Sequence, residues 1–193
     1  MRVRLVPSLV VLSVIPIAVA GELNGTVNVV GARSSADVVV YVDEIPGKTF
    51  APPEKHAAID QQDMVFVPRV LPVLVGTTVD FMNNDPFLHN VFTPDKCAEK
   101  FNLGSWPQGQ VRSYTFKAPC VAVLLCNVHP EMEAFVVAVP TPYYAVTNQA
   151  GAFKIDGVPD GTYTIKVWHP KLKGSSQEVT VSGVTELSLE LKK

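Results

Sequence analysis

The sequence predicts an all-β protein. Sixteen prolines and twelve glycines are spread along the 193 residues, which excludes long helices and favours short strands joined by turns. Runs rich in Val, Ile, Thr and aromatic residues, the types that favour strands, recur between these breakers. No stretch repeats apolar residues at helical spacing over three turns. Apolar residues make up 47% of the chain, enough for a substantial core.

The strands can be placed one after another along the chain. The first two, 25–30 and 37–42, are rich in β-branched residues and bounded by Gly or Asp, and a Pro-rich loop runs from 45 to about 58. Turn sequences such as Asp156-Gly157 and Asp160-Gly161 separate later strands. The remaining strands are expected at 64–67, 71–75, 78–82, 91–92, 111–116, 121–126, 134–139, 152–155, 162–168, 178–181 and 186–191.

Residues 1–20 have the pattern of a secretory signal peptide. Arg2 and Arg4 precede an apolar run over 9–19, which ends in the small residues Ala18-Val19-Ala20. A membrane anchor is disfavoured because this run is short and holds a proline. Cleavage would remove two arginines and take the formal net charge from −2 to −4. We therefore expect an exported protein that does not span the membrane after cleavage. The absence of Lys/Arg runs argues against nucleic-acid binding.

One short motif carries metal chemistry. Cys126, His129 and Met132 follow a predicted strand at the spacing C-x2-H-x2-M. A thiolate and a thioether combined with imidazole select copper, and a trigonal blue-copper site needs a second histidine. His89, just beyond the predicted strand 78–82, is the natural candidate. Zinc is disfavoured because thioether is a poor zinc ligand, and a binuclear copper centre would need a second cysteine in the ligand loop.

The other cysteines and histidines are expected to be structural. If 120–126 is one extended strand, the sulfurs of Cys120 and Cys126 lie about 20 Å apart and cannot bridge. A disulfide between Cys97 and Cys120 is therefore expected in an exported protein, with two buried free thiols as the alternative. His56 and His169 have no ligand-spaced neighbours, so solvated structural roles are expected for both.

Residues from about 59 to 139 resemble the cupredoxins, in particular the amicyanins. The resemblance lies in the Cys-x2-His-Pro-x-Met loop, the upstream His89-Asn90 pair and the strand sequence from Gly76 to Asn83. It implies a Greek-key β-barrel that binds one type 1 copper ion through His89, Cys126, His129 and Met132. It also implies that Asn90 holds the two ligand loops together and donates to the Cys126 sulfur. The long loop expected around 97–107 departs from the family pattern.

The two ends of the remaining chain resemble one family. Residues 147–153 and the Pro159-x-Gly-x-Tyr163 sequence resemble the carboxypeptidase-regulatory-like, transthyretin-like β-sandwich, whose opening resembles residues 25–27 and 36–41. About a hundred residues separate these halves, so we expect the cupredoxin domain to be inserted in the sandwich. The expected order is a signal peptide, the first sandwich strands, the cupredoxin domain and the remaining sandwich strands: 1–20, 21–50, 57–139 and 140–193. Two domains fused in series are the alternative.

These features together predict a periplasmic carrier of single electrons rather than an enzyme. Its partners would be redox proteins of the cytochrome or periplasmic oxidoreductase class. Phe87, Leu88, Pro130 and Pro86 are expected to form an apolar docking surface around the exposed edge of His129, unless the sandwich covers them. Copper delivery, an oxidase or nitrite reductase, and a binding sandwich with copper as its redox sensor are the alternatives.

Overall fold

The computed structural model describes residues 20–32 and 34–192, and it confirms the all-β fold class. Sixteen strands and one short 3-10 helix, η1 (Lys96–Ala98), make up the described elements. The predicted signal peptide lies outside the described residues except for Ala20. In the part of the chain that the structure describes, no helix has the length and apolarity needed to cross a membrane.

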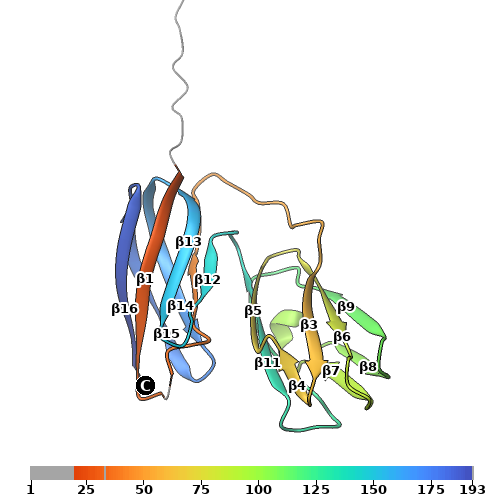
Figure 1. Ribbon diagram of the computed structural model, residues 1–193. Helices are drawn as coiled ribbons and strands as arrows, with labels where there is room; N and C mark the ends of the chain where they lie inside the picture. Colours follow the sequence, from red (N-terminus) through yellow and green to blue (C-terminus); the bar gives the residue numbers. More distant parts are fainter. Residues whose placement is uncertain (1–19, 33, 193) are drawn as a thin grey trace, which may run out of the picture.

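Strands from both ends of the chain build one β-sandwich, which we call the terminal sandwich (left in Figure 1). Strand β1 (Ala20–Val30) pairs antiparallel with β13 and parallel with β16, and β2 (Val39–Val42) pairs with β12 and β14. The later strands are β12 (Tyr144–Val146), β13 (Ala152–Pro159), β14 (Gly161–His169), β15 (Leu172–Val181) and β16 (Val184–Lys192). Residues 20–42 therefore share a core with residues 144–192, and its side chains alternate with more exposed ones along much of β1 and β14.

The intervening strands form a second unit, which we call the central domain (right in Figure 1). One sheet has the order β5-β11-β10-β7-β8 and the other has the order β4-β3-β6-β9. Buried aromatic and branched side chains, including Trp106, Phe81 and Phe116, fill the space between them. The strands are β3 (Ala57–Gln62), β4 (Val65–Val67), β5 (Val70–Leu74), β6 (Thr78–Met82), β7 (His89–Phe92), β8 (Asn102–Trp106), β9 (Val111–Thr115), β10 (Cys120–Leu125) and β11 (Glu133–Val139).

The prediction from the sequence missed three strands and placed one turn incorrectly. Strands β3, β8 and β12 were not predicted from the sequence. Polar residues in β3 and β8 hide the alternation that the paired neighbours impose, and β12 is only three residues long. The turn expected at Asp156-Gly157 is wrong, since β13 continues through it. Gly157 has a φ of 76° and lies where the register between β1 and β13 shifts, so it is the extra residue of a β-bulge.

The two units pack on each other through a small apolar cluster, the interdomain cluster. The ring of Phe135 on β11 lies 5.3 Å from that of Trp168 on β14, between their centroids. Arg69 sits over the Phe135 ring and pairs with Asp37 of the terminal sandwich and Glu133 of the central domain. The buried members of the cluster are Val39, Val70, Phe135, Val137 and Val139.

A disulfide joins Cys97 of η1 to Cys120 at the start of β10, and it leaves Cys126 as a free buried thiol. The bridge closes a loop between residues 23 positions apart, which restricts the unfolded chain. We expect the double variant Cys97→Ala/Cys120→Ala to lose about 3 kcal/mol of unfolding free energy in urea titrations. Its copper spectrum should match that of the wild type, because the bridge lies at the far end of β10 from Cys126. An unchanged urea midpoint would contradict this expectation.

Candidate metal centre

Three side chains with ligand atoms meet at one end of the central domain. His89 is the first residue of β7, Cys126 follows β10 directly, and His129 lies in the loop between β10 and β11. One ligand atom from each lies within 4.8 Å of the others. The two histidine Nδ1 atoms are 3.0 Å apart. His89 is fully buried and Cys126 is only 4% exposed, so the cluster is shielded from water apart from the half-buried His129.

The strand pairing explains why these residues converge. Strand β10 pairs with β11 along its whole length, and it pairs with β7 at Leu125, opposite Phe92. Because β10 and β7 are antiparallel, the next residue, Cys126, lies further toward the beginning of β7. The ligand loop then turns tightly, with the Met132 N–H donating to the His129 carbonyl at 3.0 Å. Met132 is buried in the same apolar cluster as Cys126. The loop therefore offers a thiol, an imidazole and a buried thioether within seven residues.

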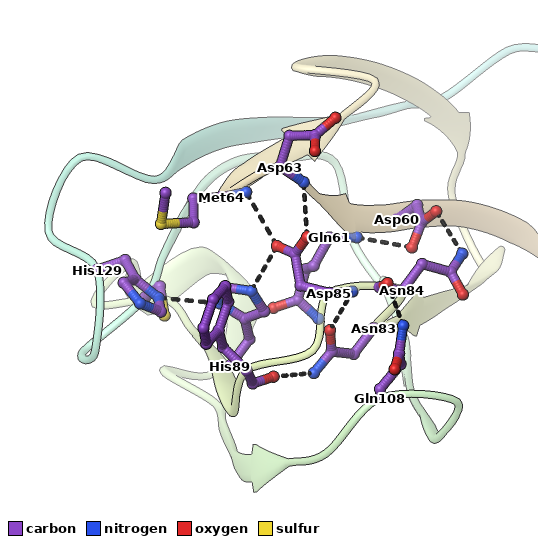
Figure 2. A network of polar contacts seen from close by, with 12 residues as sticks. Asp60, Gln61, Asp63, Met64, Asn83, Asn84, Asp85, His89, Gln108 and His129 are labelled. Carbon is purple, nitrogen blue, oxygen red and sulfur yellow. Dashed lines mark hydrogen bonds and ion pairs between the residues drawn. The ribbon is translucent and has the colours of Figure 1, made fainter.

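A buried carboxylate that the sequence analysis missed holds His89 in place (Figure 2). The Asp85 carboxylate accepts from Nε2 of His89 at 2.7 Å and from the backbone N–H groups of Asp63 and Met64 at 2.7 and 2.9 Å. Burial acts to raise the pKa of the Asp85 carboxyl, but the three donors outweigh it and leave that pKa below its ordinary value. The signal that could have revealed Asp85 is a carboxylate four residues before a ligand histidine.

The Asp85 contact also decides which atom of His89 can bind a metal. A carboxylate only accepts hydrogen bonds, so the His89 ring carries its proton on Nε2 and directs the lone pair of Nδ1 toward His129 and Cys126. Two imidazole nitrogens and a thiol sulfur within 4.8 Å of one another match the donor set of a soft metal ion. The residues present therefore fit copper.

Asn90 links the two loops that carry the ligands. Its backbone N–H points at the Cys126 sulfur at 3.5 Å, and its side-chain oxygen accepts from the Asn127 N–H at 3.4 Å. Its side-chain nitrogen donates to Asn102 and to the Gly104 carbonyl, both at 2.8 Å. The structure thus gives Asn90 contacts with the ligand loop and with β8. The donor to sulfur is the backbone N–H of Asn90.

The buried side chain of Asn83 holds the segment before His89 in place through hydrogen bonds. The Asn83 side-chain nitrogen donates to the Phe87 and Trp106 carbonyls, at 2.8 and 2.9 Å, and its oxygen accepts from the Asp85 N–H (Figure 2). The hydrogen bonds of Asn83 fix the backbone that carries Asp85 and His89. This pair is therefore positioned before any metal binds.

Apolar side chains surround the cluster on the outside. Phe87 and Leu88 are 54% and 55% exposed, and Val128 of the ligand loop is 49% exposed. Pro86 and Pro130 are exposed as well. The terminal sandwich therefore does not cover these residues, and we call them the ligand-end patch.

The remaining histidines lie outside the cluster. His56 is exposed and its Nδ1 lies 2.9 Å from the Asp80 carboxylate, which agrees with a solvated role. The expectation for His169 is wrong, because this residue is buried and accepts from the Lys171 N–H at 3.1 Å. Burial lowers the pKa of His169.

Comparison with protein families agrees with this geometry. Residues 53–139 match the family of copper binding proteins that contains plastocyanin and azurin. This segment is therefore cupredoxin-like, and copper is confirmed as the expected cofactor. Residues 140–188 match domain II of polysaccharide lyase family 4, so the resemblance to the carboxypeptidase-regulatory-like family is not confirmed. No curated protein matches the chain.

Solved structures with a similar fold cover about half of the chain. A reduced variant of amicyanin is 25% identical, with 45% of this chain and 84% of that chain covered and a TM-score of 0.42. A purple cupredoxin from Nitrosopumilus maritimus is 25% identical over 42% of this chain and 98% of its own, with a TM-score of 0.39. A Cu-containing nitrite reductase from Thermus scotoductus is 24% identical over 52% of this chain and 25% of its own, with a TM-score of 0.43.

Proposed function

We propose that the protein is an exported carrier of single electrons that uses one type 1 copper ion. The ligands would be Cys126, His89 and His129, and the Met132 thioether would be a further, weaker ligand. The observation that carries this proposal is the buried cluster whose two Nδ1 atoms lie 3.0 Å apart. Copper bound there would supply one-electron chemistry by alternating between its cuprous and cupric states.

The surrounding residues suit electron transfer because they keep the ligands in one arrangement. Asp85 fixes the His89 ring, Asn90 holds the Cys126 loop, and the Met132–His129 hydrogen bond closes the ligand loop. Ligands held in this way need little movement when the charge of the site changes, and that lowers the barrier for electron transfer. The half-buried His129 is the ligand nearest to solvent and offers the route by which an electron would enter or leave.

Copper delivery is supported less well by the same geometry. A delivery protein must release its ion to a partner, which calls for accessible and exchangeable ligands. Here His89, Cys126 and Met132 are all buried. This burial favours retention of the ion.

A redox titration tests the proposed function. We expect the copper-loaded protein to take up and release one electron per molecule reversibly, and to retain its copper in the presence of a competing chelator in both redox states. The same preparation should show no turnover with nitrite. Rapid loss of Cu(I) to the chelator would instead support delivery, and steady nitrite reduction would support an enzyme.

The proposed partners are redox proteins of the cytochrome or periplasmic oxidoreductase class, and the ligand-end patch would receive them. Small apolar surfaces of this kind suit weak, transient electron-transfer encounters. Export is proposed from the predicted signal peptide and is supported by the disulfide. Determination of the mature N-terminus, expected at Gly21, tests it.

Substitution within the ligand-end patch tests docking without an identified partner. Two copies that exchange electrons must approach through this patch, so Leu88→Glu would bring two carboxylates face to face in an apolar contact. We expect electron self-exchange, measured by NMR line broadening, to slow by about tenfold or more while the copper spectrum stays unchanged. Val184→Glu, at an even more exposed apolar residue of the terminal sandwich, is the control and should exchange at the wild-type rate. Equal rates in both variants would rule out this docking surface.

A further inference from the structure

A cavity of about 710 Å³ lies between the terminal sandwich and the central domain, apart from the metal centre. One wall is strand β5, with Val70, Leu71, Pro72 and Val73, and the opposite wall is β12, from Tyr144 to Val146. The walls are therefore mainly apolar. A volume of this size is typical of pockets that hold small organic molecules.

Both walls are edge strands, yet the β5 edge is poorly suited to pairing with another strand. The Phe135 N–H donates to the Arg69 carbonyl, and the Val75 N–H donates to the Val139 carbonyl. The backbone N–H and C=O groups of the odd-numbered residues of β5 therefore point toward β11, and those of the even-numbered residues point toward the free edge. Pro72 therefore lies at a position that faces the free edge, where it has no N–H to offer. This proline disfavours addition of a peptide strand and leaves the cavity to a small molecule.

A buried hydroxyl without a partner lies at the lining of this cavity. Thr77 is 2% exposed and lines the cavity, and its Oγ1 has no hydrogen-bond partner among the described residues. Buried hydroxyl groups are normally paired, and an unpaired one costs free energy. Rotation about χ1 carries the hydroxyl between staggered positions, so a ligand in the cavity can supply the missing partner.

The end of the cavity near Thr77 carries a positive charge. The ring of Pro52 lies against Gly76, and Ala57 pairs with Val79, so the segment that carries Lys55 runs alongside Thr77. Lys55 lines the cavity and forms no ion pair within residues 20–32 and 34–192. The other cation of the lining, Arg69, is already paired with two carboxylates.

From these observations we infer that the interdomain cavity binds a small amphipathic carboxylate. The apolar body of the ligand would lie between β5 and β12, and its carboxylate would accept from the Lys55 ammonium and the Thr77 hydroxyl. Such a ligand touches both units, so its binding stabilises their packing against each other. The inference does not depend on copper or on electron transfer.

Decanoate is a suitable probe, below the concentration at which it aggregates. We expect saturable binding to the full mature protein by calorimetry, with amide NMR shifts concentrated on β5 and β12. Uncharged 1-decanol should bind at least about tenfold more weakly because it lacks the carboxylate. Equal binding of the alcohol, shifts confined to the ligand-end patch, or no saturable binding would each overturn the proposal.

Two variants test the polar end of the cavity. Lys55→Glu should weaken decanoate binding by about tenfold or more, whereas Lys48→Glu, the same charge change at an exposed position outside the lining, should leave it unchanged. Thr77→Val should weaken binding by about fivefold, the loss expected for one hydrogen bond. The thermal stability of the ligand-free Thr77→Val variant should equal or exceed that of the wild type, since the variant removes a buried unpaired hydroxyl. Decanoate affinities that do not differ between Lys55→Glu and Lys48→Glu would contradict the assignment.

Discussion

The Asp85→Asn variant should lose about 3 kcal/mol of unfolding free energy in the metal-free protein. The carboxylate accepts three hydrogen bonds in a buried position, from His89 Nε2 and from the Asp63 and Met64 N–H groups. An asparagine keeps one oxygen acceptor but places an NH2 group against donors, so at least one buried donor loses its partner. Hydrogen bonds to a charged group contribute about 1.5–3 kcal/mol each, which sets the scale of the loss. Urea titration followed by tryptophan fluorescence measures it.

The same variant should raise the reduction potential of the copper-loaded protein. The negative charge of Asp85 behind the His89 ring makes the imidazole a better donor and favours the more highly charged cupric ion. Removing that charge favours the cuprous ion. Asp63→Asn is the matched control, because its side chain is exposed and only its backbone N–H contacts Asp85. If both variants unfold at the same urea concentration and have the same potential, the role assigned to Asp85 is wrong.

Replacing Cys126 with serine should abolish the thiolate-to-copper absorption and weaken copper binding by several orders of magnitude. The thiolate is the strong ligand of a blue-copper site, and a serine hydroxyl is a far poorer ligand for copper. The metal-free fold should persist, because serine has nearly the same shape and can still accept from the Asn90 N–H. Copper titration with absorption and circular dichroism separates loss of the metal from loss of the fold.

Met132→Leu is the control for the Cys126→Ser result. Leucine preserves the apolar volume at this buried position but removes the thioether. Because a thioether binds copper far more weakly than a thiolate does, the blue absorption should survive with a higher potential. If Cys126→Ser kept the absorption, or if Met132→Leu abolished it, the roles assigned to the two sulfur ligands would be wrong.

The fold class could be predicted because strand signals in this chain are frequent and helix signals are absent. The sequence was least informative where tertiary pairing overrides local composition. Strand β3 buries the polar Gln61 together with Ile59, and its place in the sheet depends on a parallel partner, β6. Gly157 was taken for a turn because a bulge inside a long strand uses the same residue type.

The metal ligands could be chosen from the sequence because three of them share one short loop. His89 was the harder choice, since its contact with Cys126 depends on strands far apart in the chain. The apolar cavity left no local pattern, and the local sign of Asp85 was its place four residues before His89. The Asp85 carboxylate acts through the turn at Asp63 and Met64, two residues with positive φ whose N–H groups point toward it. Such a contact between distant loops becomes visible only in the folded protein.

The central claim is that Cys126, His89 and His129 hold one copper ion together. Optical absorption and EPR of the wild-type protein during Cu(II) titration test it most directly. The account predicts an intense blue thiolate-to-copper band that saturates at one equivalent, with the narrow copper hyperfine splitting of a covalent thiolate site, and complete bleaching on addition of a reductant. A protein that stays colourless with Cu(II), or that takes up one equivalent of zinc in preference to copper, would contradict the account.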